Sequence, residues 1–130
     1  MKKALIFFAA GCLGAFANSV VVWLFGDFGI TKSLGVSISP ALTASWLYPR
    51  IVWGGIWGWL FFLPLLNSKP LAKGTILSLF PTIVQLFIVF PYKAHKGVAG
   101  IDLGVLTPMF VFVFNWVWGV VSSLTIKYSK

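Results

Sequence analysis

Four strongly polar side chains lie inside long apolar stretches of the sequence: Asn18, Arg50, Gln85 and Asn115. Arg50 is the charged one, within the run LTASWLYPRIVWGGIWGWLFFLPLL. A cation in such a run must reach the membrane interface, face a polar cavity or bind an anion, so Arg50 is the first functional candidate. A guanidinium matches the oxygen atoms of phosphate and carboxylate groups. Because the apolar stretches contain no Asp or Glu, we expect its partner to be an amide, water, a lipid headgroup or a small anion.

Helical spacing places the four polar residues at two depths. Counting about 1.5 Å per residue from the predicted cytoplasmic end of each helix, Asn18 lies at about 21 Å, Arg50 at about 24 Å, and Gln85 and Asn115 at about 15 Å. We therefore expect Arg50 to lie near Asn18, and Gln85 near Asn115. The functional interpretation is a polar cluster that binds a ligand or solute. The alternative is interhelical hydrogen bonds that only hold helices together, worth about 0.6–2 kcal/mol each.

The depth of Arg50 depends on where its helix begins. If the helix begins at Pro49, Arg50 lies in the first turn and snorkels to headgroup phosphates. If it begins at Pro40, with Ser39 as N-cap, Arg50 lies about three turns deep and faces the bundle, with Pro49 as a kink. The pair Thr107 and Pro108 predicts the start of the last helix in the same way.

Enzymatic chemistry has few side chains to use. The chain has one histidine, one cysteine and two acidic residues, His95, Cys12, Asp27 and Asp102, too few for a catalytic triad or a metal site. We expect no catalytic residue, metal or cofactor, and no enzyme. Cys12 ends a lipoprotein-like start, MKKALIFFAAGC, but the apolar run continues beyond it, which favours an uncleaved helix.

Composition identifies the element type that positions these residues. Of 130 residues, 59% are hydrophobic and 9% charged, against about 25% charged in soluble domains. Four apolar stretches, residues 4–25, 42–66, 75–91 and 105–126, have the length of a membrane span. The sequence therefore predicts an all-α integral membrane protein with one domain, residues 1–130, and four transmembrane helices. Hairpin one is residues 1–66, the turn 67–74, and hairpin two 75–130.

The net charge of +8 is spread between the apolar stretches, which favours a topology signal over nucleic-acid binding. If the helices alternate in direction, one side receives six cations and no acid, and the other receives both acids. The positive-inside rule then predicts that both termini are cytoplasmic. The short MKK start and this charge bias indicate a bacterial inner membrane. The richer side holds Lys2, Lys3, Lys69, Lys73, Lys127 and Lys130, and the other holds Lys32, Lys93, Lys96, Asp27 and Asp102.

A weak internal repeat runs through the chain. The triplet at residues 34–36, followed by Ser39-Pro40, recurs at 103–105 followed by Thr107-Pro108. The block at residues 50–54 recurs at 115–119, with Arg50 replaced by Asn115. The repeat favours two parallel helical hairpins, an arrangement that places substrate sites at the repeat interface in some transporters. The alternative is that unrelated hairpins share Gly, Pro and Trp at similar places.

Small residues at helical spacing predict close helix packing. Gly54 and Gly58 share a stripe with Arg50, and the first helix offers two partner stripes, one with Gly11 and Ala15 and one with Gly14. A homodimer through Gly54 and Gly58 is the competing use. Four aromatic residues near the expected membrane interface are candidate anchors: Trp23, Trp46, Tyr48 and Tyr92.

Two main functions fit this pattern. The first is a non-enzymatic inner-membrane protein that works by helix association, as an accessory subunit or homo-oligomer. The alternative is a small channel or transporter for an anion or polar solute, with Arg50 in the polar cluster. Lipid or quinone binding by the tryptophan-rich surface is a third. The expected partners are the lipid bilayer, the chain itself or another membrane protein, and an anionic lipid or small anion.

Overall fold

The computed structural model describes residues 2–36, 42–64, 68–93 and 97–129, without the side chains of Lys93 and Asp102. These residues form helices and no strand. In chain order the elements are α1 (Lys2–Asp27), α2 (Ile30–Ser33), α3 (Ala44–Trp57), the 3-10 helix η1 (Gly58–Phe62), α4 (Pro70–Leu77), α5 (Leu79–Val84), the π-helix η2 (Gln85–Lys93), the 3-10 helix η3 (Val98–Leu103) and α6 (Thr107–Tyr128).

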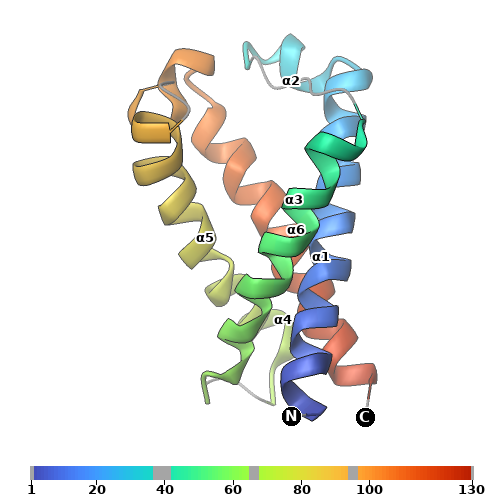
Figure 1. Ribbon diagram of the computed structural model, residues 1–130. Helices are drawn as coiled ribbons and strands as arrows, with labels where there is room; N and C mark the ends of the chain where they lie inside the picture. Colours follow the sequence, from blue (N-terminus) through green and yellow to red (C-terminus); the bar gives the residue numbers. More distant parts are fainter. Residues whose placement is uncertain (1, 37–41, 65–67, 94–96, 130) are drawn as a thin grey trace.

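The helices form an elongated bundle, with both termini at one end and α2 and η3 at the opposite end (Figure 1). The first helix, α1, packs against both α3 and α6, and α4 packs against α6. Among the described residues, three helices are long and apolar enough to cross a membrane: Lys2–Asp27, Pro70–Tyr92 and Thr107–Tyr128. The structure is therefore that of a helical membrane protein, as the composition predicts.

Buried apolar side chains lie at successive levels along the bundle. Ala15, Phe61, Leu77 and Trp118 form one cluster, from four different elements. A second cluster of Val22, Val36, Phe110 and Phe114 lies nearer the opposite end. Many large apolar side chains remain on the outer surface, including Trp53, which is 59% exposed. An apolar surface on this scale fits contact with lipid rather than water.

The helix that contains Arg50 begins between the two starts that the sequence suggests, Pro40 and Pro49. Leu42 and Thr43 are not helical, α3 starts at Ala44, and the Thr43 hydroxyl accepts a 3.3 Å hydrogen bond from the Trp46 N–H. The predicted start at Pro40 is wrong because Thr43 caps the helix instead. The segment also ends earlier, at Phe62. Leu63 is extended, as expected for a residue before a proline.

Two other helix starts also differ in detail from the sequence-based expectation. The turn predicted at 67–74 is shorter, since α4 begins at Pro70, where proline suits the first turn. The last helix runs Thr107–Tyr128, close to its predicted range. Its N-cap is Leu106, however, and the buried Thr107 Oγ1 makes no hydrogen bond within the described part of the chain. Thr107 therefore lies inside α6 and does not cap it. Ser39, which the sequence suggests as a similar cap, lies outside the described residues.

The π-helix η2 was not predicted. It begins at Gln85 and includes Pro91, which has no N–H to donate to the carbonyl four residues earlier. A wider helical turn is one way for a chain to continue past such an interruption, and π-helical turns are frequent at functional sites.

Candidate functional site

The first helix uses both of its small-residue stripes, one on each neighbour. A side chain at Gly11 would collide with the Gly54 carbonyl oxygen and lie 2.9 Å from Gly58 Cα. A side chain at Gly54 would collide with Ala15. The Gly11 and Ala15 stripe therefore brings α1 and α3 into backbone contact. This contact occupies Gly54 and Gly58 within one chain, so a homodimer through that stripe is incompatible with the structure.

The second stripe of α1 faces α6. A side chain at Gly14 would lie 2.6 Å from the Trp118 carbonyl oxygen and would collide with Ser122 Oγ. The Ser122 hydroxyl donates a 3.2 Å hydrogen bond to the Ala10 carbonyl. Because α1 is in close contact with two helices, its rotation about its own axis is fixed, and so are the directions in which Asn18 and Ser19 point.

Arg50 points inward, toward α1. Its Nε donates to Ser19 Oγ over 2.9 Å, and its Nη2 donates to Asn18 Oδ1 over 2.6 Å. The Trp46 ring, one turn earlier on α3, lies under the guanidinium with its centroid 4.7 Å from Cζ, a cation–π contact. The predicted neighbourhood of Arg50 and Asn18 is therefore present. Trp46, predicted as an interface anchor, packs against Arg50.

Asn18 connects three helices. While its Oδ1 accepts from Arg50 on α3, its Nδ2 donates to the Phe114 carbonyl on α6. Asn18 is only 5% exposed, so these hydrogen bonds form away from water. Satisfying both ends of the amide also fixes which end is the acceptor. The Arg50 guanidinium is thus held in one place by Asn18, Ser19 and Trp46.

The guanidinium retains hydrogen-bonding capacity. Arginine has five N–H groups, and Ser19 and Asn18 accept from two of them. Within the described ranges, the other three have no protein acceptor, and Arg50 makes no ion pair with a carboxylate. Asp27, the acidic residue whose side chain is described, ends α1 and is exposed. A positioned cation with free donors suits an anionic ligand.

The second predicted pair is also present, on the other hairpin. Asn115 Nδ2 lies 3.1 Å from Thr82 Oγ1 and 3.3 Å from Gln85 Oε1, and it donates to both. Thr82 in turn donates to the Ser78 carbonyl over 2.8 Å. No side-chain hydrogen bond among the described residues joins this pair to Arg50. The four polar residues therefore form two separate groups. The groups are adjacent in the chain, because Asn18 donates to the carbonyl of Phe114, the residue before Asn115.

Close contacts in the two hairpins follow the same pattern. Gly11 meets Gly54 in the first, and a side chain at Gly74 would lie 2.5 Å from the Gly119 carbonyl oxygen in the second. In the first hairpin, Ser19 lies eight residues after Gly11 and accepts a hydrogen bond from Arg50. In the second, Thr82 lies eight residues after Gly74 and accepts a hydrogen bond from Asn115. Arg50 and Asn115 each precede their hairpin's second glycine by four residues. The repeat in sequence therefore has a counterpart in side-chain contacts.

Lys73 is a buried cation that the sequence did not reveal. Its side chain is 8% exposed, and Nζ donates to the Phe61 carbonyl over 3.0 Å, near the Phe61 ring. Phe61 lies in the last turn of η1, where carbonyl groups lack helical partners. Lys73 therefore caps η1 from α4. Its position in a predicted polar turn gave no signal of this role.

Several other predicted residues have plainer surroundings. Tyr48 and Tyr92 are 64% and 76% exposed, as an anchor requires, and Trp23 is half-buried. Cys12 is a free, half-buried thiol inside α1. His95 lies outside the described residues, as does the side chain of Asp102. Three indole N–H groups have acceptors: those of Trp59, Trp116 and Trp118.

The described part of the chain contains no group of three or more His, Cys, Asp or Glu side chains that could hold a metal ion. Its polar side chains include one positioned guanidinium, amides, hydroxyls and lysines. Comparison of the chain with protein-family models, with curated proteins and with solved structures finds no significant match.

Proposed function

We propose that this protein is a small non-enzymatic membrane protein that binds an anion at Arg50 and works as an anion or polar-solute channel or transporter. The observation that supports it is the guanidinium itself. It is fixed by Asn18 and Ser19, makes no carboxylate pair in the described structure, and has three further N–H donors. In a membrane such a charge is costly unless an anion, water or headgroup compensates it.

A fourth membrane span belongs to this proposal. α3 has 14 residues and η1 has 5. At about 1.5 Å per α-helical and 2.0 Å per 3-10 residue, the two together extend about 31 Å, close to a bilayer core of about 30 Å. With four spans both termini lie on one side. The excess of lysines on that side supports a cytoplasmic location in a bacterial inner membrane.

The parallel contacts of the two hairpins support a duplicated architecture. A side chain at Gly104 would collide with the Gly35 carbonyl oxygen and lie 2.9 Å from Val36 Cα, so the two loops that correspond in the repeat touch each other. When two repeats are related by a two-fold axis, corresponding loops that lie near the axis contact each other. Asn18 lies between the hairpins, because it contacts α3 and α6. An anion at Arg50 would therefore bind beside the repeat interface, where related architectures place their substrates.

The experiment compares wild type, Arg50→Gln and Lys32→Gln, reconstituted at full length in phosphatidylcholine vesicles. Fluxes of chloride, acetate and inorganic phosphate are measured, and binding of the same anions is titrated in detergent. Arg50→Gln should lower binding and flux by about tenfold or more, because hydrogen bonds to a charged group are worth about 1.5–3 kcal/mol. Lys32 is exposed beyond α1, so Lys32→Gln should behave as wild type. Equal flux and binding in wild type and Arg50→Gln would reject the proposal.

The span and topology proposal has its own test. In a Cys12→Ser background, single cysteines at Ser33, Ser68 and Ser129, all exposed, are treated with a membrane-impermeant maleimide in intact cells. We expect the cysteine at 33 to react from outside, and those at 68 and 129 only after permeabilisation. Reaction of positions 33 and 68 from the same side would remove the α3–η1 span.

Association with another membrane component is a second candidate function, and one exposed surface on α3 favours it. Trp53 and Val52 are exposed on the outer face of α3, where another membrane protein, a lipid or a quinone would find aromatic contacts. The glycine faces cannot serve this purpose, because they are filled within the chain. The test is purification of wild type and Trp53→Ala in mild detergent. A stoichiometric partner that co-purifies with wild type but not with Trp53→Ala would support association, and a monomer alone would count against it.

A further inference from the structure

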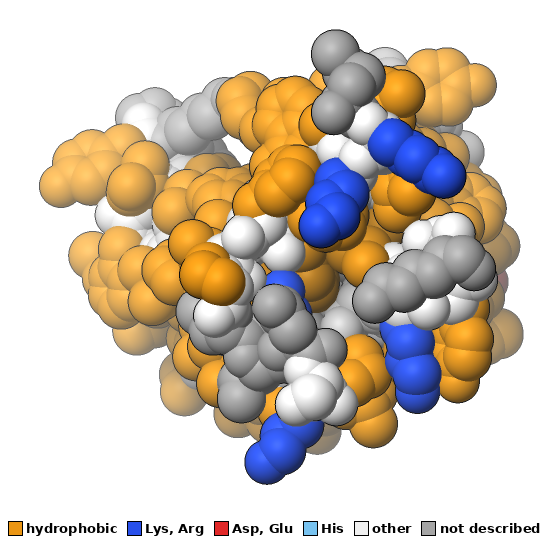
Figure 2. All heavy atoms as spheres, turned by 90° about the horizontal axis from the view of Figure 1, so that it is seen from below, with side chains coloured by type: hydrophobic (Ala, Val, Ile, Leu, Met, Phe, Trp, Pro, Cys, Tyr) orange, Lys and Arg blue, Asp and Glu red, His pale blue; other side chains and the backbone are white. Residues whose placement is uncertain are grey.

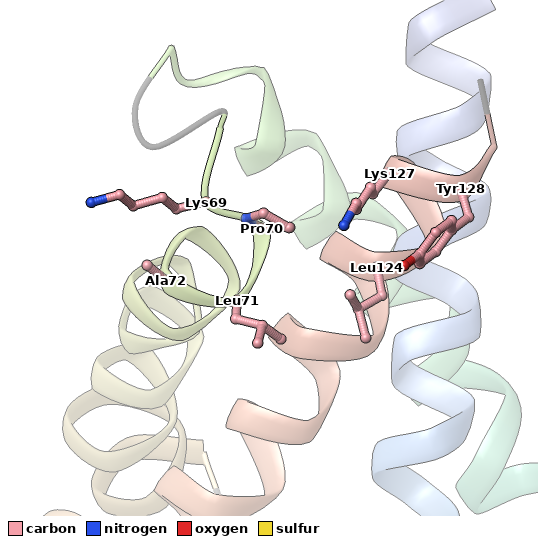
Figure 3. Close-up of a pocket in the computed structure, with 7 residues that line it drawn as sticks. All are labelled: Lys69, Pro70, Leu71, Ala72, Leu124, Lys127 and Tyr128. Atoms are coloured by element: carbon pink, nitrogen blue, oxygen red, sulfur yellow. The ribbon is translucent and has the colours of Figure 1, made fainter.

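A cavity of about 550 Å³ lies between the start of α4 and the last turns of α6, at the end of the bundle that holds both termini (Figures 1 and 3). It is lined by Lys69, Lys127 and Tyr128 and by the apolar side chains of Leu71 and Leu124. The volume is within the range of small-molecule sites. It is separate from Arg50, which contacts α1 toward the other half of the molecule.

The cavity lies where α6 extends beyond the start of α4. Gly74 and Gly119 bring the two backbones into contact, and one turn further the Ser123 hydroxyl donates to the Pro70 carbonyl over 2.5 Å. There α4 begins, whereas α6 continues to Tyr128. The last turn of α6 therefore has no α4 residues opposite it. This gap follows from the register of the two helices, which pairs Pro70 with Ser123.

The chemistry of the cavity is amphipathic. In Figure 3 the Lys127 ammonium points into the space between Pro70 and Leu124, and Leu71 and Leu124 line the deeper part. Lys69 lies on the far side of Pro70, and its ammonium extends away from this space. Lys127 Nζ lies 5.1 Å from the centroid of the Tyr128 ring. An occupant should therefore carry negative charge at the rim and apolar chain within.

The electrostatic surroundings favour a negatively charged occupant. Figure 2, which views this end of the molecule, shows Lys or Arg side chains around it. Lys2 and Lys3 begin α1, whose N-terminus lies at this end. The acidic residue with a described side chain, Asp27, ends α1 at the opposite end of the bundle. The first turn of α4 adds backbone N–H groups of Leu71 and Ala72, for which the N-cap residue Lys69 provides no side-chain acceptor.

We infer that this cavity binds the phosphate headgroup of an anionic membrane lipid, with the upper part of an acyl chain against Leu71 and Leu124. Basic pockets between membrane helices recognise such headgroups. A lipid satisfies both halves of the cavity, whereas free inorganic phosphate would leave the apolar half unfilled. The inference is independent of any ligand at Arg50.

The test uses the full-length protein in a neutral detergent, titrated with phosphatidylglycerol or phosphatidylcholine and read by native mass spectrometry. Three forms are compared: wild type, Lys127→Gln, and Lys3→Gln as a matched loss of a cation at the same end. We expect wild type to bind phosphatidylglycerol in preference to phosphatidylcholine. Lys127→Gln should weaken phosphatidylglycerol binding by about fivefold, the contribution expected of one basic residue near an anionic surface. Lys3→Gln should stay near wild type.

Leu124→Trp fills the apolar half of the cavity without a change of charge. It should also reduce phosphatidylglycerol binding while the protein keeps its helical circular dichroism. Three results would overturn the inference: equal binding of the two lipids by wild type, equal effects of Lys127→Gln and Lys3→Gln, or displacement of bound lipid by inorganic phosphate alone. The last result would assign the lysines to a soluble phosphate instead.

Discussion

Arg50 Nη2 donates a 2.6 Å hydrogen bond to Asn18 Oδ1, and the other end of the same amide donates to the Phe114 carbonyl. One buried side chain thereby holds α3, α1 and α6 together. The guanidinium is oriented by this amide and by Ser19, so its remaining donors have fixed directions. A charge held in this way suits recognition of an anion better than a mobile side chain, which must first be ordered.

Asn18→Ala should destabilise the protein by about 1–3 kcal/mol, because it removes a hydrogen bond to a charged group and leaves the Phe114 carbonyl without its amide donor. The free energy of unfolding, measured in mixed micelles, tests this. A double-mutant cycle with Arg50→Ala should give a clear coupling energy between the two residues. Strict additivity would mean that the Arg50–Asn18 contact contributes nothing.

Gly54→Leu should unfold or strongly destabilise the chain, by about 1–3 kcal/mol or more, because the new side chain would collide with Ala15 on α1. Ile56→Leu, an exposed position on the same helix, is the control and should have little effect. Thermal unfolding followed by circular dichroism compares them. A stable Gly54→Leu variant with only its oligomeric state changed would restore the homodimer interpretation.

Asn115→Ala should cost about 0.6–2 kcal/mol, since it removes interhelical hydrogen bonds to Thr82 and Gln85. Anion binding should not change, because this pair lies apart from Arg50. The two quantities are measured on the same preparation by unfolding and by anion titration. Loss of anion binding in Asn115→Ala would instead unite the four polar residues into one site.

Lys73→Met should destabilise the protein by about 1–3 kcal/mol, although methionine fits an apolar neighbourhood, because the Phe61 carbonyl loses its donor. Lys69→Met at an exposed position four residues earlier provides the control. The midpoint of thermal unfolding should fall clearly only for Lys73→Met. Equal midpoints for both variants would show that the η1 cap is dispensable.

Much of this arrangement could be predicted from local patterns. Long apolar stretches predict helices, and spacing by four residues predicts the stripes on α1 and α3. Because the rise per residue is the same in every α-helix, counting along the expected α-helices also predicts that Arg50 lies near the depth of Asn18, and Gln85 near that of Asn115. These properties depend on residues within the same few turns, which a sequence displays directly.

Other features depend on where separate helices meet. The sequence shows two small-residue stripes on α1 but not the helix that each one contacts. The packing of both neighbours shows that the Gly11 stripe contacts α3 and the Gly14 stripe contacts α6. The start of α3 at Ala44 and the burial of Lys73 were likewise not predictable. In the first case the helix start is set by Thr43 and not by Pro40, three residues earlier. In the second, a carbonyl twelve residues away accepts from the lysine.

The sequence by itself thus determined a helical membrane protein with one arginine among apolar residues, because hydrophobicity and helical periodicity are local properties. The tertiary structure decided that this arginine faces inward. That direction follows from the rotation of α3 about its axis, which the contact of Gly54 and Gly58 with α1 fixes. The rotation of a helix about its axis depends on all the helices that pack against it. It therefore cannot be predicted from the residue pattern of that helix alone.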